Sequence, residues 1–221
     1  MPRSRERTYV SIGVPMNRSK AEYFDSQVFS GWASEEYTRE EREKIEDMLQ
    51  RAGWSIEMGI LEPGCGTGRL TEILANRAAS GGYILASDIS GKMIEAARER
   101  VAPRDNVRIE CAAVEDLDLG AETFDLVLCH QVFPHFDDKE RTLKKLTGCL
   151  KPSGKLVMFH FINSAQINDM HRKTDPSVMA DSMPEAAEMK ALLQACGFVI
   201  DILRDDDAGY LMIARKSSDD R

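Results

Sequence analysis

Residues 60–68 read ILEPGCGTG, an apolar run followed by three glycines within five residues. Glycine adopts positive φ angles at little steric cost and lets a ligand come close to the backbone. A glycine-rich turn between a strand and a helix also directs the helix N-terminus at that ligand. The stretch therefore predicts a strand, a ligand-binding turn and a helix, in that order.

Two acids accompany this turn. Glu62 precedes Gly64 by two residues, and Asp88 closes the next apolar run in LASDIS. The spacing of Gly64, Gly66 and Gly68 departs from the GxGxxG pattern of dinucleotide sites. A carboxylate beside the turn opposes a pyrophosphate but suits a cation, and an acid after the second strand can accept both ribose hydroxyls. Together these features favour S-adenosylmethionine, which carries a sulfonium and an ammonium group.

The hydrophobic pattern predicts a doubly wound α/β fold. We expect strands over 58–62, 83–88, 107–112, 124–129, 154–160, 198–203 and 209–214, and helices over about 67–79, 90–101, 138–150 and 184–196. Several strands are apolar on both faces, which is typical of a parallel sheet covered by helices on both sides. Only a short polar turn separates the last two strands, so they form a hairpin and one strand is antiparallel.

Composition limits the classes of partner. The chain has 221 residues and a net charge of −8, which argues against general binding to nucleic acid or to an anionic membrane. No apolar run approaches the roughly 18 residues of a membrane span. The five cysteines are an odd number without a CxxC pair, which favours reduced thiols and a cytoplasmic location over disulfides or a zinc knuckle.

Four stretches carry a family resemblance: ILEPGCGTGRLTEILA, LASDISGKMIEAAR, VEDLDLGAETFDLVLCHQVFPHFDD and LKPSGKLVMFHF. They resemble the class I S-adenosylmethionine-dependent methyltransferases, in the type 11 or ubiquinone/menaquinone-biosynthesis-like group, over roughly residues 20–215. The resemblance implies a Rossmann-like, seven-stranded sheet with one antiparallel strand. It also implies an enzyme that methylates a small molecule and releases S-adenosylhomocysteine.

The resemblance also implies a set of cofactor-binding residues. These are Trp32, Glu62, Gly64, Cys65, Gly66, Thr67, Gly68, Asp88, Ile89, Met93, Val114, Glu115, Cys129 and His130. Glu62 and the glycine turn would hold the methionyl part, and Asp88 would hold the ribose. Ile89 and Met93 would lie beside the adenine, and the Cys129 backbone would lie near the methionyl amine.

One position departs from the family pattern. Where the family often has an acid that meets the adenine amino group, this chain has Ala113. Either the Val114 backbone alone contacts the adenine, or Glu115 or Asp116 replaces the missing acid.

The resemblance suggests three segments. Residues 1–18 are expected to be a flexible tail, 19–56 an N-terminal helical lid, and 57–221 the methyltransferase domain with a polar insertion at 163–183. Within the lid, Ser34 is expected to cap a helix that Gly53 ends. Trp32 either belongs to the lid over the methionyl group or is a core anchor.

The four histidines all lie after residue 129. His130 and His135 follow the fourth predicted strand, His160 ends the fifth, and His171 lies in the insertion. Ligands of open α/β sheets bind at the carboxyl ends of the strands, so all four are expected on the functional rim. His135, His160 and His171 are the catalytic candidates, and His160 is preferred because a strand end fixes a side chain better than a loop does.

Three roles for the histidines stay open. If the acceptor carries a proton, a base must remove it, and histidine suits this near neutral pH. Three imidazoles could instead hold a transition metal, although no metal ligands are assigned. They could also simply line the pocket.

The function prediction has an alternative. A sensor or metal-handling protein would bind S-adenosylmethionine without transferring its methyl group. No (N/D)PP(Y/F) stretch or Pro-Cys pair points to a nucleic-acid methylase, so the expected partner is a small-molecule acceptor. The oligomeric state is open, with a homodimer as one possibility.

Overall fold

The computed structural model describes residues 17–79 and 81–217. One sheet holds seven strands in the order β3-β2-β1-β4-β5-β7-β6. The strands are β1 (Gly59–Pro63), β2 (Tyr83–Asp88), β3 (Val107–Cys111), β4 (Phe124–His130), β5 (Leu150–His160), β6 (Phe198–Asp206) and β7 (Gly209–Lys216). Strand β7 runs antiparallel to both β5 and β6, and the other pairs are parallel. The predicted sheet and its hairpin are confirmed.

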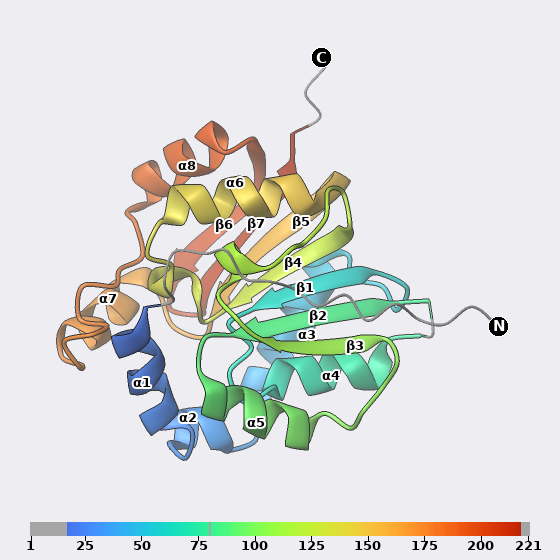
Figure 1. Cartoon of the computed structure of the whole chain (residues 1–221). Helices are drawn as coiled ribbons and strands as arrows, with labels where there is room; N and C mark the ends of the chain where they lie inside the picture. Colours follow the sequence, from blue (N-terminus) through green and yellow to red (C-terminus); the bar gives the residue numbers. More distant parts are fainter. Residues whose placement is uncertain (1–16, 80, 218–221) are drawn as a thin grey trace.

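Helices cover both faces of the sheet, as Figure 1 shows. They are α1 (Arg18–Gln27), α2 (Gly31–Ser34), α3 (Arg39–Ala52), α4 (Arg69–Arg77), α5 (Gly91–Arg100), α6 (Lys139–Cys149), α7 (Ser164–Arg172) and α8 (Ala186–Ala195), with short 3-10 turns η1 (Val114–Asp116) and η2 (Phe133–His135). Side chains of β4 alternate between two cores: Val127 packs in the core under α6 and α8, and Leu128 packs in the core under α3 and α4. This period of two confirms that both faces are buried. No helix in the described part of the chain is long and apolar enough to cross a membrane.

The first long helix begins later than the sequence suggested. Thr38, not Ser34, caps α3, because its hydroxyl accepts a hydrogen bond from the Glu41 backbone N–H while the Glu41 side chain accepts from the Thr38 N–H. This reciprocal pair is a capping box. Ser34 instead ends the short α2. Gly53 ends α3 with a left-handed φ of 71°, as expected.

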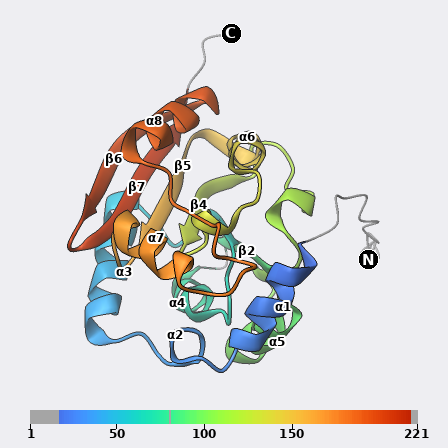
Figure 2. The same cartoon turned by 90° about the vertical axis from the view of Figure 1, so that its left-hand side faces the viewer.

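The predicted lid divides into two parts. Helix α3 buries Ile45, Met48 and Leu49 in the core against the sheet, so it belongs to the helical layers. Only α1 and α2 lie away from the sheet, and we call these two the lid helices (Figure 2). The predicted tail lies almost entirely outside the described residues.

The insertion at 163–183 is packed rather than loose. It forms α7 and then returns through turns toward α1 (Figure 2). The Asn168 side chain closes it, donating to the Met183 carbonyl at 3.0 Å and accepting from the Met183 N–H at 2.8 Å. Ile167 and Met183 are buried in the core under α6 and α8.

Candidate active site

A cavity of about 270 Å³ lies at the carboxyl ends of β1, β2 and β4, where Pro63, Asp88 and His130 end their strands. It is bordered by residues of η1, η2 and the lid helices. Of the predicted cofactor residues, those that line it are Trp32, Glu62, Gly64, Cys65, Gly66, Thr67, Asp88, Ile89, Met93, Val114, Glu115 and His130. The structure therefore brings most of the predicted set together around one space.

The glycine turn needs its glycines for two different reasons. Gly64 has a φ of 68°, and a Cβ there would lie 2.2 Å from Val132 Cγ2. Gly66 has a φ of 54°, but a Cβ there would meet nothing within 4 Å. The Gly66 N–H donates to Asp88 Oδ2 at 2.9 Å, which ties the turn to the end of β2. Gly64 thus permits close packing, and Gly66 leaves an open face toward the cavity.

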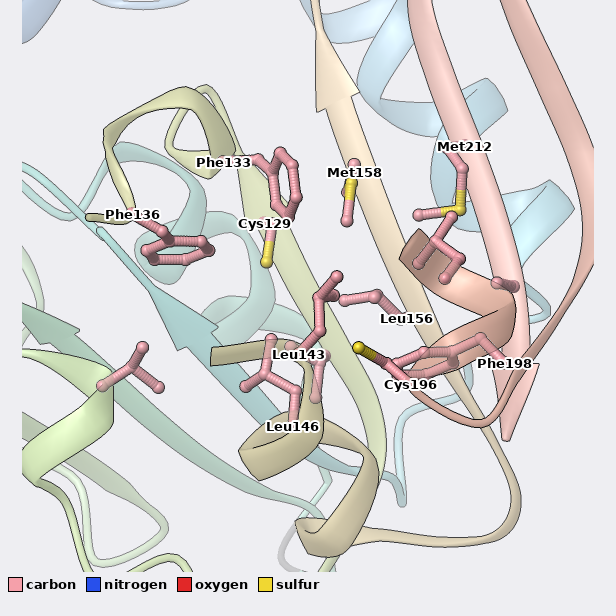
Figure 3. Close-up of a cluster of buried hydrophobic side chains, with 14 of the residues drawn as sticks. Cys129, Phe133, Phe136, Leu143, Leu146, Leu156, Met158, Cys196, Phe198 and Met212 are labelled. Atoms are coloured by element: carbon pink, nitrogen blue, oxygen red, sulfur yellow. The ribbon is translucent and has the colours of Figure 1, made fainter. Parts of the chain in front are cut away.

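Two predicted cofactor residues do not line the cavity. Gly68 caps α4 with a φ of 79°, and a Cβ there would lie 3.0 Å from that of Ala97, so this glycine permits α4 and α5 to pack closely. Cys129 is buried, and its side chain lies in the core with Phe133 and Met158 (Figure 3). Only the backbone of Cys129 could therefore contact a cofactor.

Two acids share the cavity wall. Burial raises the pKa of Glu62 to about 8, although the Thr71 hydroxyl donates to its carboxylate at 2.8 Å; the nearby Asp88 raises that pKa further. Burial also raises the pKa of Asp88, against hydrogen bonds from the backbone N–H groups of Ser90 and Gly66. A cation in the cavity would favour the ionised form of both acids.

Two histidines line the cavity, and each has its Nδ1 atom engaged. His130 Nδ1 lies 3.2 Å from the Phe159 carbonyl oxygen, which can only accept, so Nδ1 carries the hydrogen. Burial lowers the pKa of His130 to about 4. His135 Nδ1 lies 2.7 Å from Asp181 Oδ2. Burial lowers the pKa of His135, and the bond from Asp181 opposes this. Within residues 17–79 and 81–217 no group bonds either Nε2, so with a hydrogen on Nδ1 each ring presents Nε2 as an acceptor.

The other two histidines lie outside the cavity lining. The His171 ring centroid is 4.8 Å from that of His135, and His171 Nδ1 bonds the Asp181 carbonyl at 2.9 Å. His160 is only 4% exposed and faces Tyr210, with ring centroids 6.2 Å apart. Among the described residues, the His160 Nε2 and the Tyr210 hydroxyl have no hydrogen-bond partner.

The preferred catalytic candidate, His160, therefore lies at the predicted strand end but outside the cavity lining. Along β5 the side chains alternate, and His160 falls on the same face as Met158, which packs under α6 and α8. A catalytic role for His160 or His171 stays a prediction, and among the three candidates only His135 lines the cavity.

No sequence pattern pointed to Lys20 as a residue of this site. Lys20 comes from α1, is 2% exposed, and also lines the cavity. Its ammonium donates to the His135 carbonyl at 2.8 Å, to Asp137 at 2.8 Å and to Asp181 at 2.9 Å. Neither Lys20 nor Asp181 belongs to a recognisable local pattern, because their contacts join distant segments.

The lid helices also contact the cofactor side of the cavity. The Thr67 hydroxyl donates to the Ala33 carbonyl, and Arg69 donates to the Trp32 carbonyl. The Arg69 guanidinium lies 3.8 Å from the centroid of the Tyr37 ring, a cation–π contact. Trp32, half exposed, lies at the cavity rather than in the core.

The described side chains do not form a metal site. Across residues 17–79 and 81–217, no three His, Cys, Asp or Glu side chains are grouped so that they could hold a metal ion. Of the four histidines expected on one rim, His130 and His135 line the cavity, and His160 and His171 do not.

Comparison with known proteins agrees with this geometry. Residues 61–158 match the sequence profile of the type 11 methyltransferases, described as a methyltransferase domain. This part of the chain is a class I methyltransferase domain. The matched residues include the glycine turn, both acids and the two histidines of the cavity.

The methyltransferase domain also has curated relatives. A malonyl-(acyl-carrier protein) O-methyltransferase of Priestia megaterium is 32% identical over 155 residues, which cover 67% of this chain and 56% of the relative. A ubiquinone biosynthesis O-methyltransferase of Coxiella burnetii is 32% identical over 105 residues, 47% of this chain and 43% of the relative. The chain thus spans about half the length of the curated relatives it matches.

Solved structures share the fold of the methyltransferase domain. A putative sarcosine dimethylglycine methyltransferase from Galdieria sulphuraria has a TM-score of 0.68 at 15% identity, covering 88% of this chain and 98% of that one. The (4+2)-cyclase SpnF has a TM-score of 0.70 at 17% identity, covering 94% and 99%. Because a cyclase is among these structures, the fold by itself does not specify the reaction.

Proposed function

We propose that this chain is an S-adenosylmethionine-dependent methyltransferase that acts on a small molecule carrying a proton on the atom to be methylated. One observation carries the proposal: the same cavity holds the glycine turn with its two acids and, in its wall, a histidine with a free Nε2. The match to a methyltransferase domain and the two O-methyltransferase relatives support it.

The residues of the cavity fit the proposed cofactor. Glu62 is buried and Asp88 is partly buried, a cation would favour the ionised form of both, and the turn is open at Gly66. Glu62 and the turn would hold the methionyl part, and Asp88 the ribose. When bound, S-adenosylmethionine supplies a methyl group already activated by the sulfonium.

The adenine end has apolar walls and one fixed acid. Ile89, Met93 and Val114 line the cavity there. Glu115 also lines it and accepts a hydrogen bond from the Thr142 hydroxyl of α6. This bond holds Glu115 in place, which supports Glu115 as the acid that replaces the one missing at Ala113.

The acceptor end has a base and a water-excluding cover. Phe24 of α1 packs edge-on against the His135 ring, with centroids 5.1 Å apart. His135 Nε2 would take the acceptor's proton, and the lid helices would keep water out. The lid helices contribute Lys20, Phe24 and Trp32 to the cavity wall, and a covered site favours a small acceptor over a macromolecule.

The alternatives rest on weaker ground. A metal-handling role has no support from the described side chains, and a sensor without transfer has no contact that favours it. A cytoplasmic location and a homodimer stay predictions.

The test uses methyl-labelled S-adenosylmethionine, the purified protein, and a cell extract divided into small-molecule and macromolecular fractions. Label in a small molecule is the expected result. Label in protein or RNA would contradict the acceptor class. Cofactor binding without transfer in any fraction would contradict the proposed activity and favour the sensor.

A further inference from the structure

The Asp181 carboxylate joins three elements. It lies in the turns after α7, with Oδ2 2.7 Å from His135 Nδ1 of η2 and Oδ1 2.9 Å from Lys20 Nζ of α1. The Asp181 carbonyl oxygen also accepts from His171 Nδ1 of α7 at 2.9 Å. Its side chain is only 13% exposed. A largely buried carboxylate with these contacts can hold its partners in a defined orientation.

We propose that Asp181 is a positioning residue for methyl transfer: it fixes His135 with the hydrogen on Nδ1, so that Nε2 accepts the proton of the acceptor. The inference rests on the proposed function, and it extends that function to a residue in the insertion.

The hydrogen-bond chemistry determines the tautomer of His135. An ionised carboxylate only accepts hydrogen bonds, so the 2.7 Å contact requires a hydrogen on Nδ1. Burial disfavours the ionised form of Asp181. The hydrogen bonds that it accepts from His135 and Lys20 outweigh this and hold the pKa of Asp181 below its usual range. The Lys20 ammonium thus keeps the acceptor of the His135 hydrogen bond charged.

The lining of the cavity supports this orientation of the ring. His135 belongs to the cavity lining, whereas Asp181, which accepts the hydrogen bond from His135 Nδ1, does not. We therefore infer that Nε2 is the ring nitrogen nearer the cavity. Nε2 has no hydrogen-bond partner among the described residues, and Phe24 limits rotation of the ring. The arrangement resembles the carboxylate–histidine pair of hydrolytic triads, in which the carboxylate orients the imidazole and stabilises its cation.

The proposed step balances. His135 Nε2 takes the proton of the acceptor atom while the lone pair of that atom forms a bond to the methyl carbon. The electrons of the broken carbon–sulfur bond stay on sulfur. The resulting His135 cation is stabilised by Asp181 and afterwards gives its proton to solvent.

The insertion offers a control at Asp169 of α7. Asp169 pairs with Arg172 and Lys173 and does not line the cavity, whereas Asp181 pairs with Lys20 and His135. We expect Asp181→Asn to lower kcat about 100-fold or more with the Kd for S-adenosylhomocysteine unchanged. Asp169→Asn should change kcat less than about threefold, and Asp181→Glu should restore part of the loss. Equal kcat for the two Asn variants would overturn the proposal.

A pH profile gives a second readout. The charged and titratable groups around His135 are Asp181, His171 of α7, His160 of β5, Lys20 of α1 and, through Asp181, Lys139 of α6. Because Asp181 favours the His135 cation, its loss should move the acidic limb of the kcat profile to lower pH. The same limb in wild type and Asp181→Asn would contradict the proposed contact.

A third measurement needs no acceptor. Nitrogen-15 NMR of histidine-labelled wild-type protein should show His135 with its hydrogen on Nδ1, and Asp181→Asn should show a mixture of tautomers. A wild-type His135 with its hydrogen on Nε2 would overturn the inference even if the variant fails to fold. If cofactor binds but no methyl group is ever transferred, the proposed function fails, while the tautomer still decides the role of Asp181 as the partner of His135.

Discussion

The end of the cavity proposed for the cofactor and the end proposed for the acceptor are built in different ways. The cofactor end comes largely from one contiguous turn, residues 60–68, with Asp88 from the next strand. The acceptor end joins Lys20 to His135 and Asp181 across 115 and 161 residues of sequence. A ligand common to many proteins can be held by a local motif, whereas the acceptor end depends on tertiary packing. The sequence motif therefore indicates the cofactor but says little about the substrate.

The largest expected effect concerns the acceptor end. His135→Gln should lower kcat about 100-fold or more, because it removes the proposed base, while the Kd for S-adenosylmethionine changes less than about threefold. Initial rates and calorimetry measure the two effects. The matched variant is His160→Gln, since His160 is buried and does not line the cavity. A larger loss of kcat in His160→Gln would identify His160 as the base, as the sequence first suggested.

A smaller effect is expected at the cofactor end. Asp88→Ala should weaken cofactor binding more than tenfold, because a hydrogen bond to a charged group is worth about 1.5–3 kcal/mol. It also releases the Gly66 N–H that Asp88 holds. Asp25→Ala is the control, since Asp25 contacts the Ser90 hydroxyl but does not line the cavity. Unchanged affinity in Asp88→Ala by titration calorimetry would contradict the ribose assignment.

The pH dependence of cofactor binding tests the second acid. The pKa of Glu62 is about 8 in the ligand-free protein, so this acid is mostly protonated at pH 6. A cation favours its ionised form; affinity should therefore rise several-fold from about pH 6 to 8, with proton release on binding. The raised pKa also affects stability. The free energy of unfolding of the ligand-free protein should fall as the pH rises from the pKa of Glu62 in the unfolded chain toward 8, because the folded state then has to ionise a buried acid. Glu62→Gln should abolish the part of both pH trends that comes from this acid.

Proton release is measured by calorimetry in buffers of different ionisation enthalpy. Equal release in wild type and Glu62→Gln would show that another group, or the ligand itself, titrates in this range.

The smallest effect is expected at Gly68. Gly68→Ala should lower the free energy of unfolding by about 1–2 kcal/mol, because a Cβ is disfavoured in the left-handed region and crowds Ala97. Cofactor affinity should change less than about threefold, since Gly68 does not line the cavity. Denaturant titration and calorimetry separate the two quantities. A large loss of affinity at normal stability would return Gly68 to the cofactor end.

The sequence predicted the fold well because its signals are local. Strand and helix positions follow from hydrophobic period, and the β6–β7 hairpin follows from the short polar turn. The start of α3 was missed because both Ser34 and Thr38 are good capping residues, and only the reciprocal bond with Glu41 selects Thr38. Most of the residues predicted to bind the cofactor line one cavity, since they surround one turn.

The acceptor end was harder to predict for a physical reason. The hydrophobic pattern predicts that His160 ends a strand. The cavity, however, lies at the carboxyl ends of only some strands, and the alternation of side chains along a strand does not say which face of the sheet borders it. Asp181 lies in a polar segment whose path is determined by packing of Ile167 and Met183 in the core. No spacing in the sequence links it to Lys20 or His135.

The lid helices have a consequence for the rate of turnover. They are tied to the rest of the molecule by Thr67 with Ala33, Arg69 with Trp32, Asp25 with Ser90, and Lys20 with Asp181. These contacts lie at both ends of the cavity, so we expect that several of them must break together before spent cofactor leaves. Product release would then be slower than chemistry, and rapid mixing of enzyme with both substrates would give a burst of one methylated product per active site before the steady state.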